Sequence, residues 1–109
     1  MEKDGSFYIK MQKKYDVLII GAGPAGIFAA LELAKKSNLR IALIEKGFDI
    51  EARNKRMSGW GGAGAYSDGK LTLSTEVGGQ LLSNLPSDEA YELLQYTDNI
   101  YLQFGATNT

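Results

Sequence analysis

The 109-residue sequence contains no cysteine and no histidine. Without cysteine, the chain has no disulfide, no thiolate metal ligand and no redox-active dithiol. Without histidine, it also lacks imidazole acid–base chemistry and the commonest metal ligand of proteins. Proton transfer by this chain therefore falls to Asp, Glu, Lys or Tyr side chains, or to a group that the chain binds.

Neither sign of charge is in large excess, because the formal net charge is −1. The charge gives no electrostatic reason to expect nucleic acid or an anionic membrane as a partner. The hydrophobic fraction of 44% and the charged fraction of 23% are ordinary for a soluble globular protein. The length corresponds to one small domain.

The sequence also lacks a long hydrophobic run. Four lysines within residues 1–14 precede an uncharged stretch at residues 17–31, an order that resembles a secretory signal. That stretch is shorter than the roughly 20 apolar residues of a membrane-spanning helix, and glycines interrupt its middle. We therefore expect a cytoplasmic protein.

A strand followed by a helix is predicted immediately after this N-terminal segment. Residues 17–20 form a short β-branched apolar run that ends at a glycine, as in a strand buried on both faces of a parallel sheet. Pro24 suits the first turn of a helix, where a missing N–H costs nothing. Apolar residues then recur at helical spacing over residues 27–34, and Ser37-Asn38 closes the helix.

A second buried strand is predicted at residues 40–44, and it ends at Glu45. Strand, helix and strand within about thirty residues form one right-handed βαβ unit. The fold class is therefore α/β, with a Rossmann-like βαβ unit as its centre.

The segments outside this unit carry weaker patterns. Residues 7–9 fit a short edge strand or a frayed extension. Residues 49–57 fit a short helix, and residues 58–64 form a glycine-rich loop around a tryptophan, either ordered or flexible. Residues 65–73 fit a hairpin with a two-residue turn.

A loop at residues 74–85 and an amphipathic helix complete the sequence. Ser87 is the expected N-cap of this helix, with two acidic residues in its first turn. Leu93 to Phe104 carries an apolar stripe, which we interpret as core or domain interface, and Gly105 is the stop signal.

Residues 21–26, Gly-Ala-Gly-Pro-Ala-Gly, match the pattern G-x-G-x-x-G between the predicted strand and helix. Glu45 follows 19 positions after Gly26, at the end of the next strand, which completes the context of a dinucleotide fingerprint. Gly21 permits a tight turn, Gly23 lets the backbone approach a pyrophosphate, and Gly26 lets the helix pack closely on the sheet.

The helix start would stabilise the pyrophosphate through free N–H groups and the positive end of the helix dipole. Glu45 would accept hydrogen bonds from an adenosine ribose and would repel a 2′-phosphate, which argues against NADP in this pocket. The alternative is a glycine-rich strand–helix turn that binds no ligand. The fingerprint alone does not separate FAD from NAD.

Two segments resemble known flavoproteins. Residues 15–26, together with Ile44-Glu45-Lys46, look like the N-terminus of the two-dinucleotide-binding-domain flavoproteins. Residues 59–71, Gly-Trp-Gly-Gly-Ala-Gly-Ala-Tyr-Ser-Asp-Gly-Lys-Leu, resemble a more specific signature of a family of bacterial FAD-dependent dehydrogenases. The resemblance spans about residues 15–105.

The resemblance implies a fragment, because such proteins are several times longer. Residues 1–14 would be an extension, and residues 15–109 the N-terminal portion of an FAD/NAD(P)-binding domain. The fold would be an incomplete three-layer sandwich, with the rest of that domain and the substrate domain absent. We expect such a fragment to be inactive, to bind FAD weakly or not at all, and to self-associate.

The resemblance also gives the second glycine cluster a role beside the cofactor. Backbone N–H groups of Gly61, Gly62 and Gly64 would reach it, and Trp60 would stack on it or line its pocket. The alternative is a mobile linker with Trp60 as a packing residue. Arg53 and Arg56 are either contacts to adenine or phosphate, or solvated charges on a short helix.

The candidate cofactor-binding residues are therefore Gly21, Gly23, Pro24, Ala25, Gly26, Glu45, Lys46, Arg53, Trp60, Gly61, Gly62 and Gly64. We expect no metal site, and the sequence identifies no catalytic residue. The disulfide-reductase flavoproteins place a cysteine pair soon after the second strand. This chain has none, so dithiol relay is excluded for this segment.

Three functions follow from these patterns. The first is an FAD-dependent oxidoreductase in which this segment binds the ADP half of FAD and hydride chemistry occurs at the flavin. NAD(P)H is then a candidate electron donor or acceptor. The second is an NAD-binding domain of a dehydrogenase, and the third is a non-enzymatic nucleotide-binding module.

Overall fold

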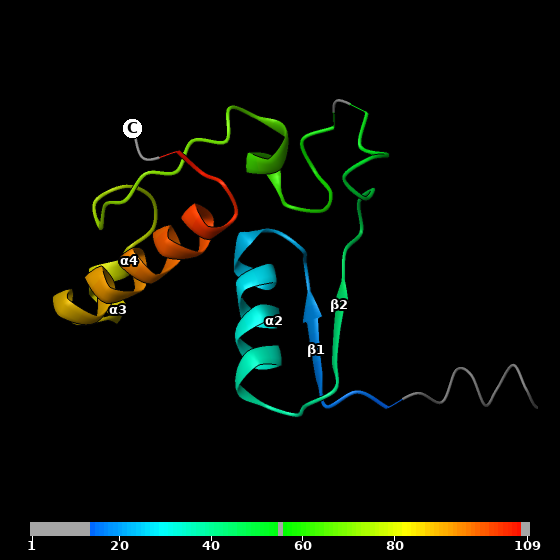
Figure 1. Ribbon diagram of the computed structural model, residues 1–109, viewed down its shortest axis with the longest axis horizontal. Coiled ribbons are helices and arrows are strands. Elements are labelled where there is room, and N and C mark those ends of the chain that lie inside the picture. The colour runs from blue at the N-terminus through cyan, green and yellow to red at the C-terminus, as the bar shows by residue number, and fades with distance from the viewer. Residues whose placement is uncertain (1–13, 55, 108–109) are drawn as a thin grey trace, which may run out of the picture. The chain divides into compact units, whose positions relative to one another are not determined.

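The computed structural model describes residues 14–54 and 56–107 (Figure 1). These residues divide into two units, the first ending at Lys70 and the second beginning at Leu71. The edge strand considered for residues 7–9 lies outside the described residues.

The first unit is built on two parallel strands and the helix that connects them. Strand β1 (Val17–Ile20) leads into helix α2 (Pro24–Lys36), and strand β2 (Ile41–Ile44) returns beside β1 (Figure 1). The strands pair in register, from Val17 opposite Ile41 to Ile20 opposite Ile44. The predicted βαβ unit is confirmed, with β2 beginning one residue later than expected.

The start of α2 follows from local chemistry. Pro24 occupies the first helical turn, where no N–H is required. The first helical hydrogen bond runs from the Ile27 N–H to the Gly23 carbonyl oxygen at 3.0 Å. The N–H groups that precede Ile27 therefore have no partner inside the helix.

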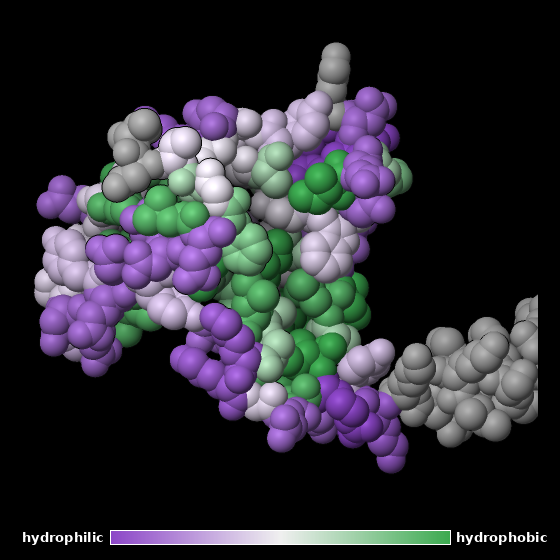
Figure 2. Space-filling view, viewed as in Figure 1, coloured by the Kyte–Doolittle hydropathy of each residue, from purple (hydrophilic) through white to green (hydrophobic). Residues whose placement is uncertain are grey.

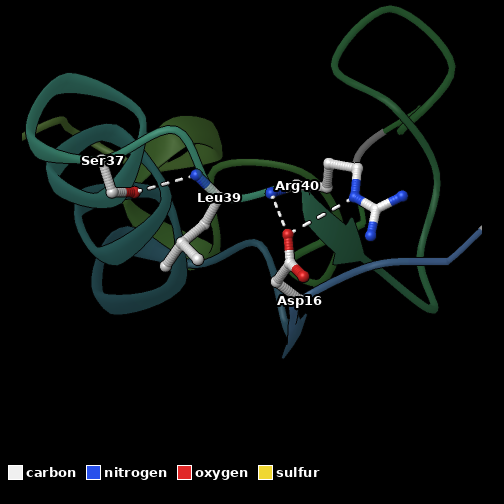
Figure 3. Close-up of polar contacts among 4 residues, drawn as sticks. All are labelled: Asp16, Ser37, Leu39 and Arg40. Carbon is white, nitrogen blue, oxygen red and sulfur yellow. Dashed lines mark hydrogen bonds and ion pairs between the residues drawn. The ribbon is translucent and has the colours of Figure 1, made fainter.

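The end of α2 and the start of β2 are fixed by two polar side chains (Figure 3). The Ser37 hydroxyl donates to the Leu33 carbonyl oxygen at 2.6 Å and accepts the Leu39 N–H at 3.3 Å. Asp16 accepts the backbone N–H of Arg40 at 2.8 Å and its Nε at 3.4 Å. These bonds lower the pKa of Asp16, the backbone bond contributing most.

The two faces of the sheet differ in burial. Ile19 faces α2, since its side chain lies beside Gly26 of that helix. Leu18 and Ile20 alternate with it and are 57% and 80% exposed. The prediction that β1 is buried on both faces is therefore wrong. Among the described residues of this unit, a helix covers one face of the strand only. In Figure 2, hydrophobic residues gather over α2 and the two strands.

Helix α2 and strand β1 approach each other closely at Gly26. A Cβ built on Gly26 would overlap the Gly21 carbonyl oxygen and would lie 3.3 Å from the Ile19 Cγ2. Only glycine therefore fits here without moving the helix away from the strand. The packing role expected of Gly26 is confirmed.

The segment after β2 contains turns where a short helix was expected over residues 49–57. Asp49 closes a local turn, because its Oδ1 accepts the Ala52 N–H at 2.9 Å. Among the described residues of this stretch no helix forms, and Asn54 adopts a φ of +45°. The helical prediction is wrong because Asp49 bonds the backbone locally and the side chain of Arg53 bonds carbonyl groups further along the chain.

The hairpin expected at residues 65–73 is also wrong. A 3₁₀ helix, η1 (Ala63–Tyr66), occupies its first part, and residues 67–74 form no strand. The turn chemistry itself was correct, since Asp68 accepts the Lys70 N–H at 3.0 Å and Gly69 has a φ of +68°. Leu71 and Leu73 alternate as in a strand, but no neighbouring strand pairs with this described stretch.

The second unit contains helix α3 (Leu81–Asn84) and helix α4 (Ser87–Gln103). Helix α3 lies in a segment that was predicted as loop. Helix α4 confirms the predicted long amphipathic helix, which ends just before Gly105, a residue with a φ of +98°. Ser87 is the first helical residue rather than the N-cap, a position that Pro86 takes without a side-chain hydrogen bond.

The apolar stripe of α4 is partly exposed within this chain. Leu93 is 51% exposed and Phe104 is 82% exposed, whereas Ala90 is buried. The stripe therefore does not form a closed core here, and its assignment to an interface stays a prediction.

We predict that Gly26→Ala destabilises the fold, because the added Cβ would overlap the Gly21 carbonyl oxygen. Overpacking of this kind costs about 1–3 kcal/mol, more than the up to about 1 kcal/mol that alanine gains over glycine in a helix. Gly23→Ala is the matched control, since a Cβ at Gly23 meets no atom within 4 Å. Urea unfolding should give a larger loss of free energy for Gly26→Ala than for Gly23→Ala, whose loss is limited to the poorer N-cap preference of alanine. Equal losses in both variants would refute the packing argument.

Candidate functional site

Two glycine-rich segments meet at the start of α2. The first glycine loop comprises residues 21–26, and the second glycine loop comprises residues 59–64. The Gly61 N–H donates to the Ala22 carbonyl oxygen at 2.7 Å. A Cβ on Gly62 would lie 3.1 Å from the Pro24 Cδ, so the two loops are also in close contact. The structure thus brings together segments that are almost forty positions apart in sequence.

The first glycine loop turns the chain away from the sheet and leaves open space at the helix start. Gly21 has a φ of +106°, and its N–H still bonds the Ile44 carbonyl oxygen at 2.7 Å. Gly23 is the N-cap of α2, in an extended conformation that any residue adopts. No atom lies within 4 Å of a Cβ built on Gly23. The backbone conformation at Gly23 therefore does not require glycine. What glycine provides here is the open space that a side chain would fill.

Backbone N–H groups are the donors available beside this space. In the part of the chain that the structure describes, no acceptor holds the N–H groups of Gly23, Ala25 or Gly26. Pro24 and Ala25 are exposed at the helix start. The arrangement is a helix N-terminus with free donors and positive dipole, which is chemistry suited to an anion.

Glu45 lies directly after β2 and connects this strand end to the first glycine loop. Its Oε1 accepts the Ala22 N–H at 3.1 Å, and its Oε2 accepts the Gly47 N–H at 2.6 Å. These two bonds are the main causes that lower the pKa of Glu45, followed by the charges of Lys46 and Arg53. The carboxylate is therefore ionised and held in place, with further lone pairs left for a ligand. Lys46, the next candidate, is exposed.

The second glycine loop has a defined conformation. Gly59, Gly61 and Gly62 have φ values of +137°, +87° and +71°. The Trp60 N–H donates to the Phe48 carbonyl oxygen at 3.0 Å. Gly64 belongs to η1, and a Cβ there would meet nothing within 4 Å. These bonds favour the ordered loop over the mobile linker.

Trp60 is half-buried and borders a shallow depression of about 450 Å³. The depression is also lined by Asp49, Ile50 and Glu51. The depression is open and partly acidic and includes no residue of the first glycine loop, so the role of Trp60 beside a cofactor stays a prediction.

Arg53 occupies a position that the sequence did not predict. Its side chain is buried, at 1% exposure, and donates hydrogen bonds to carbonyl oxygens of its own segment. Nη1 donates to the carbonyl oxygens of Trp60 at 2.9 Å and Gly62 at 2.6 Å, while Nε and Nη2 both donate to that of Arg56. The alternative of a solvated charge on a short helix is wrong for Arg53. Arg56 is exposed and stacks 4.4 Å above the Phe48 ring.

Gly47 and Gly59 are structural parts of the site that the sequence reasoning missed. A Cβ on Gly47 would lie 2.6 Å from the Gly59 Cα, and one on Gly59 would lie 2.6 Å from the Phe48 carbonyl oxygen. The segment leaving β2 therefore crosses the second glycine loop in backbone contact. The isolated Gly47, three positions after the end of β2, is the available signal for such an approach.

The described residues contain no cluster of His, Cys, Asp and Glu that would hold a metal ion. None of the helices seen in residues 14–54 and 56–107 is long and apolar enough to cross a membrane.

A parallel βαβ unit with a glycine-rich turn before its helix and an acid after its second strand is typical of the Rossmann-like dinucleotide-binding fold. Comparison with known proteins identifies the family of this chain. The family model described as "FAD dependent oxidoreductase" matches residues 16–108, and the chain belongs to this family.

Individual relatives are flavoprotein oxidoreductases. A thioredoxin reductase of Ureaplasma parvum is 33% identical over 91 residues, which are 82% of this chain and 23% of the relative. The succinate dehydrogenase flavoprotein subunit of Coxiella burnetii is 43% identical over 53 residues, 49% of this chain and 9% of the relative. An electron transfer flavoprotein-ubiquinone oxidoreductase of Arabidopsis thaliana is 45% identical over 42 residues, 34% of this chain and 7% of the relative.

The chain thus spans less than a quarter of the length of each of these relatives. No solved structure matches the chain significantly.

We predict that Glu45 stabilises the fold in a pH-dependent way. The folded state lowers the pKa of Glu45 below its ordinary value of 4.5, so the stabilisation is present above pH 4.5 and is lost as the pH falls through the lowered pKa. Glu45→Gln should therefore be less stable than the wild type near neutral pH, and the gap should shrink in acid. Unfolding by urea at a series of pH values measures this gap.

Glu92→Gln is the control, because it removes the same charge from an exposed position on α4 of the second unit. A gap between wild type and Glu45→Gln that stays constant through the acid range would contradict the assigned hydrogen bonds.

Proposed function

We propose that this chain binds the ADP half of FAD at the start of α2, as part of a flavin-dependent oxidoreductase. One observation carries the proposal. The two glycine loops are joined by the bond from Gly61 to Ala22, and the space in front of Gly23 stays open beside free helix N–H groups.

The pyrophosphate would be held at the first turn of α2. A side chain at Gly23 would fill the open space, so glycine leaves the room that a phosphate group needs. Free N–H groups of Ala25 and Gly26 and the helix dipole would stabilise its negative charge. Pro24 adds rigidity to this turn without removing a needed donor.

The adenosine ribose would be held by Glu45. Its carboxylate is ionised and is fixed by the N–H groups of Ala22 and Gly47, so it is oriented before a ligand arrives. A neutral ribose hydroxyl can donate to such a carboxylate, whereas a 2′-phosphate would meet a like charge. This favours FAD or NAD over NADP at this position.

Bound FAD would supply the redox chemistry, since a flavin accepts and donates hydride at its isoalloxazine ring. The chain's own residues would bind and orient the other end of the cofactor. Lys46, Trp60, Gly62 and Gly64 stay predicted contacts around it. Membership of the FAD dependent oxidoreductase family supports FAD over the alternative of an NAD-binding domain.

Similarity to a thioredoxin reductase does not imply that this segment carries dithiol chemistry. The chain contains no cysteine, so a dithiol that passes electrons to a protein substrate would have to lie elsewhere. We further propose that the chain functions with additional sequence that supplies substrate contacts, with NAD(P)H as candidate electron donor or acceptor. Cytoplasmic residence and self-association of the isolated segment stay predictions.

We predict that Gly23→Glu removes FAD from the full-length protein. The new carboxylate would occupy the open space and repel the pyrophosphate. We expect FAD affinity to fall by at least about 100-fold, equal to about 2.7 kcal/mol. The flavin absorption of the purified protein and equilibrium binding of FAD to the apoprotein measure this.

Ala29→Glu adds the same charge on an exposed position of α2 and is the matched control, which should keep its flavin. Unchanged FAD affinity in Gly23→Glu would refute the proposal. Tighter binding of NADH than of FAD by the wild type would favour the NAD-binding alternative. Retention of FAD without reduction of a dye by NAD(P)H would favour the non-enzymatic module.

A further inference from the structure

Arg53 is the one buried charged side chain among the described residues. In this part of the chain no carboxylate lies within ion-pair distance of it, since the ion pairs found there join Lys36 to Glu32 and Arg40 to Asp16. A buried charge is costly unless hydrogen bonds replace the lost water. Here carbonyl oxygens alone provide those bonds, and the Tyr66 ring lies 5.5 Å from the guanidinium carbon.

The guanidinium binds both ends of a short backbone segment. It donates to the Arg56 carbonyl oxygen on one side and to the Trp60 and Gly62 carbonyl oxygens on the other. A planar guanidinium offers several donors in a rigid fork, which a lysine ammonium does not reproduce. Arg53 therefore closes the chain between residues 56 and 62 into one hydrogen-bonded loop.

These bonds also set the direction of the loop's peptide groups. In a trans peptide the N–H points opposite to the C=O of the preceding residue. Because the Trp60 carbonyl points to Arg53, the Gly61 N–H points away from it, and there it meets the Ala22 carbonyl oxygen at 2.7 Å. Arg53 thus lies behind the loop, on the side opposite the first glycine loop.

The loop needs such a partner because glycines dominate it. Gly59, Gly61 and Gly62 all have positive φ, and glycine loses more conformational freedom on ordering than any other residue. A loop that is ordered before the ligand arrives costs less free energy to bind it. Carbonyl oxygens directed at Arg53 are also kept from facing a negatively charged ligand.

We propose that Arg53 is a positioning residue for the pyrophosphate of FAD, acting through the second glycine loop without touching the cofactor. This inference rests on the proposed function. It replaces the expectation of a direct contact between Arg53 and the cofactor with an indirect role, exerted through the carbonyl groups of Trp60 and Gly62.

The test compares Arg53→Gln and Arg53→Lys with Lys36→Gln in the full-length protein. Lys36 is exposed at the C-terminal end of α2, so its substitution removes the same charge without touching either glycine loop. Equilibrium binding of FAD to each apoprotein gives the affinity. The ³¹P resonances of the bound FAD pyrophosphate report its surroundings, which a change in overall stability alone would not move.

We expect Arg53→Gln to weaken FAD binding by about tenfold or more, equal to about 1.4 kcal/mol or more. Arg53→Lys should fall between Arg53→Gln and wild type, and both variants should shift the ³¹P resonances of bound FAD. Lys36→Gln should keep FAD affinity within about twofold of wild type.

Unchanged affinity and unchanged ³¹P resonances in the Arg53 variants would overturn the proposal. An equal loss in Lys36→Gln would also overturn it, because net charge would then be the cause. If neither Arg53 variant folds, Arg53 is a folding residue and the positioning role is refuted. Failure of the proposed function is distinguishable, since Gly23→Glu would then bind FAD as well as wild type does.

Discussion

The close approach of α2 to the end of β1 is the constraint on which the rest of the first unit depends. Gly26 lets the helix lie against the Gly21 carbonyl oxygen, where any side chain would push the two apart. With the helix in this place, Ala22 comes within reach of Glu45 through its N–H and of Gly61 through its carbonyl oxygen. One backbone contact therefore brings the helix start, the acid after β2 and the second glycine loop to one place.

The candidate site is made mainly of backbone groups, and two charged side chains orient them from different sides. Glu45 accepts N–H groups from the first glycine loop and from the exit of β2. Arg53 binds carbonyl oxygens of the second glycine loop. The opposite charges of these side chains match the opposite polarities of the groups they hold. Membership of the FAD dependent oxidoreductase family agrees with a site that presents backbone donors to a dinucleotide.

Sequence reasoning was correct for the elements that neighbouring residues determine. It was wrong for the segments whose conformation depends on contacts between residues further apart in the chain. The βαβ unit follows from apolar runs, Pro24 and glycine spacing, all of which act within a few residues. The helix expected at residues 49–57 does not form, and the bonds of Arg53 to residues seven and nine positions later could not be read from periodicity. The hairpin at residues 65–73 failed similarly, because its turn residues were right but a strand needs a partner. For each candidate residue, contact with a cofactor stays a prediction.

Trp60 is the only tryptophan in the chain, and it lies between Gly59 and Gly61 of the second glycine loop. Its N–H bonds the Phe48 carbonyl oxygen and its own carbonyl oxygen bonds Arg53, so its surroundings change whenever that loop changes. The indole emission of this segment consequently arises from a single place. The intensity and lifetime of this emission therefore report optically on the order of the second glycine loop and, under the proposed function, on nucleotide binding beside it.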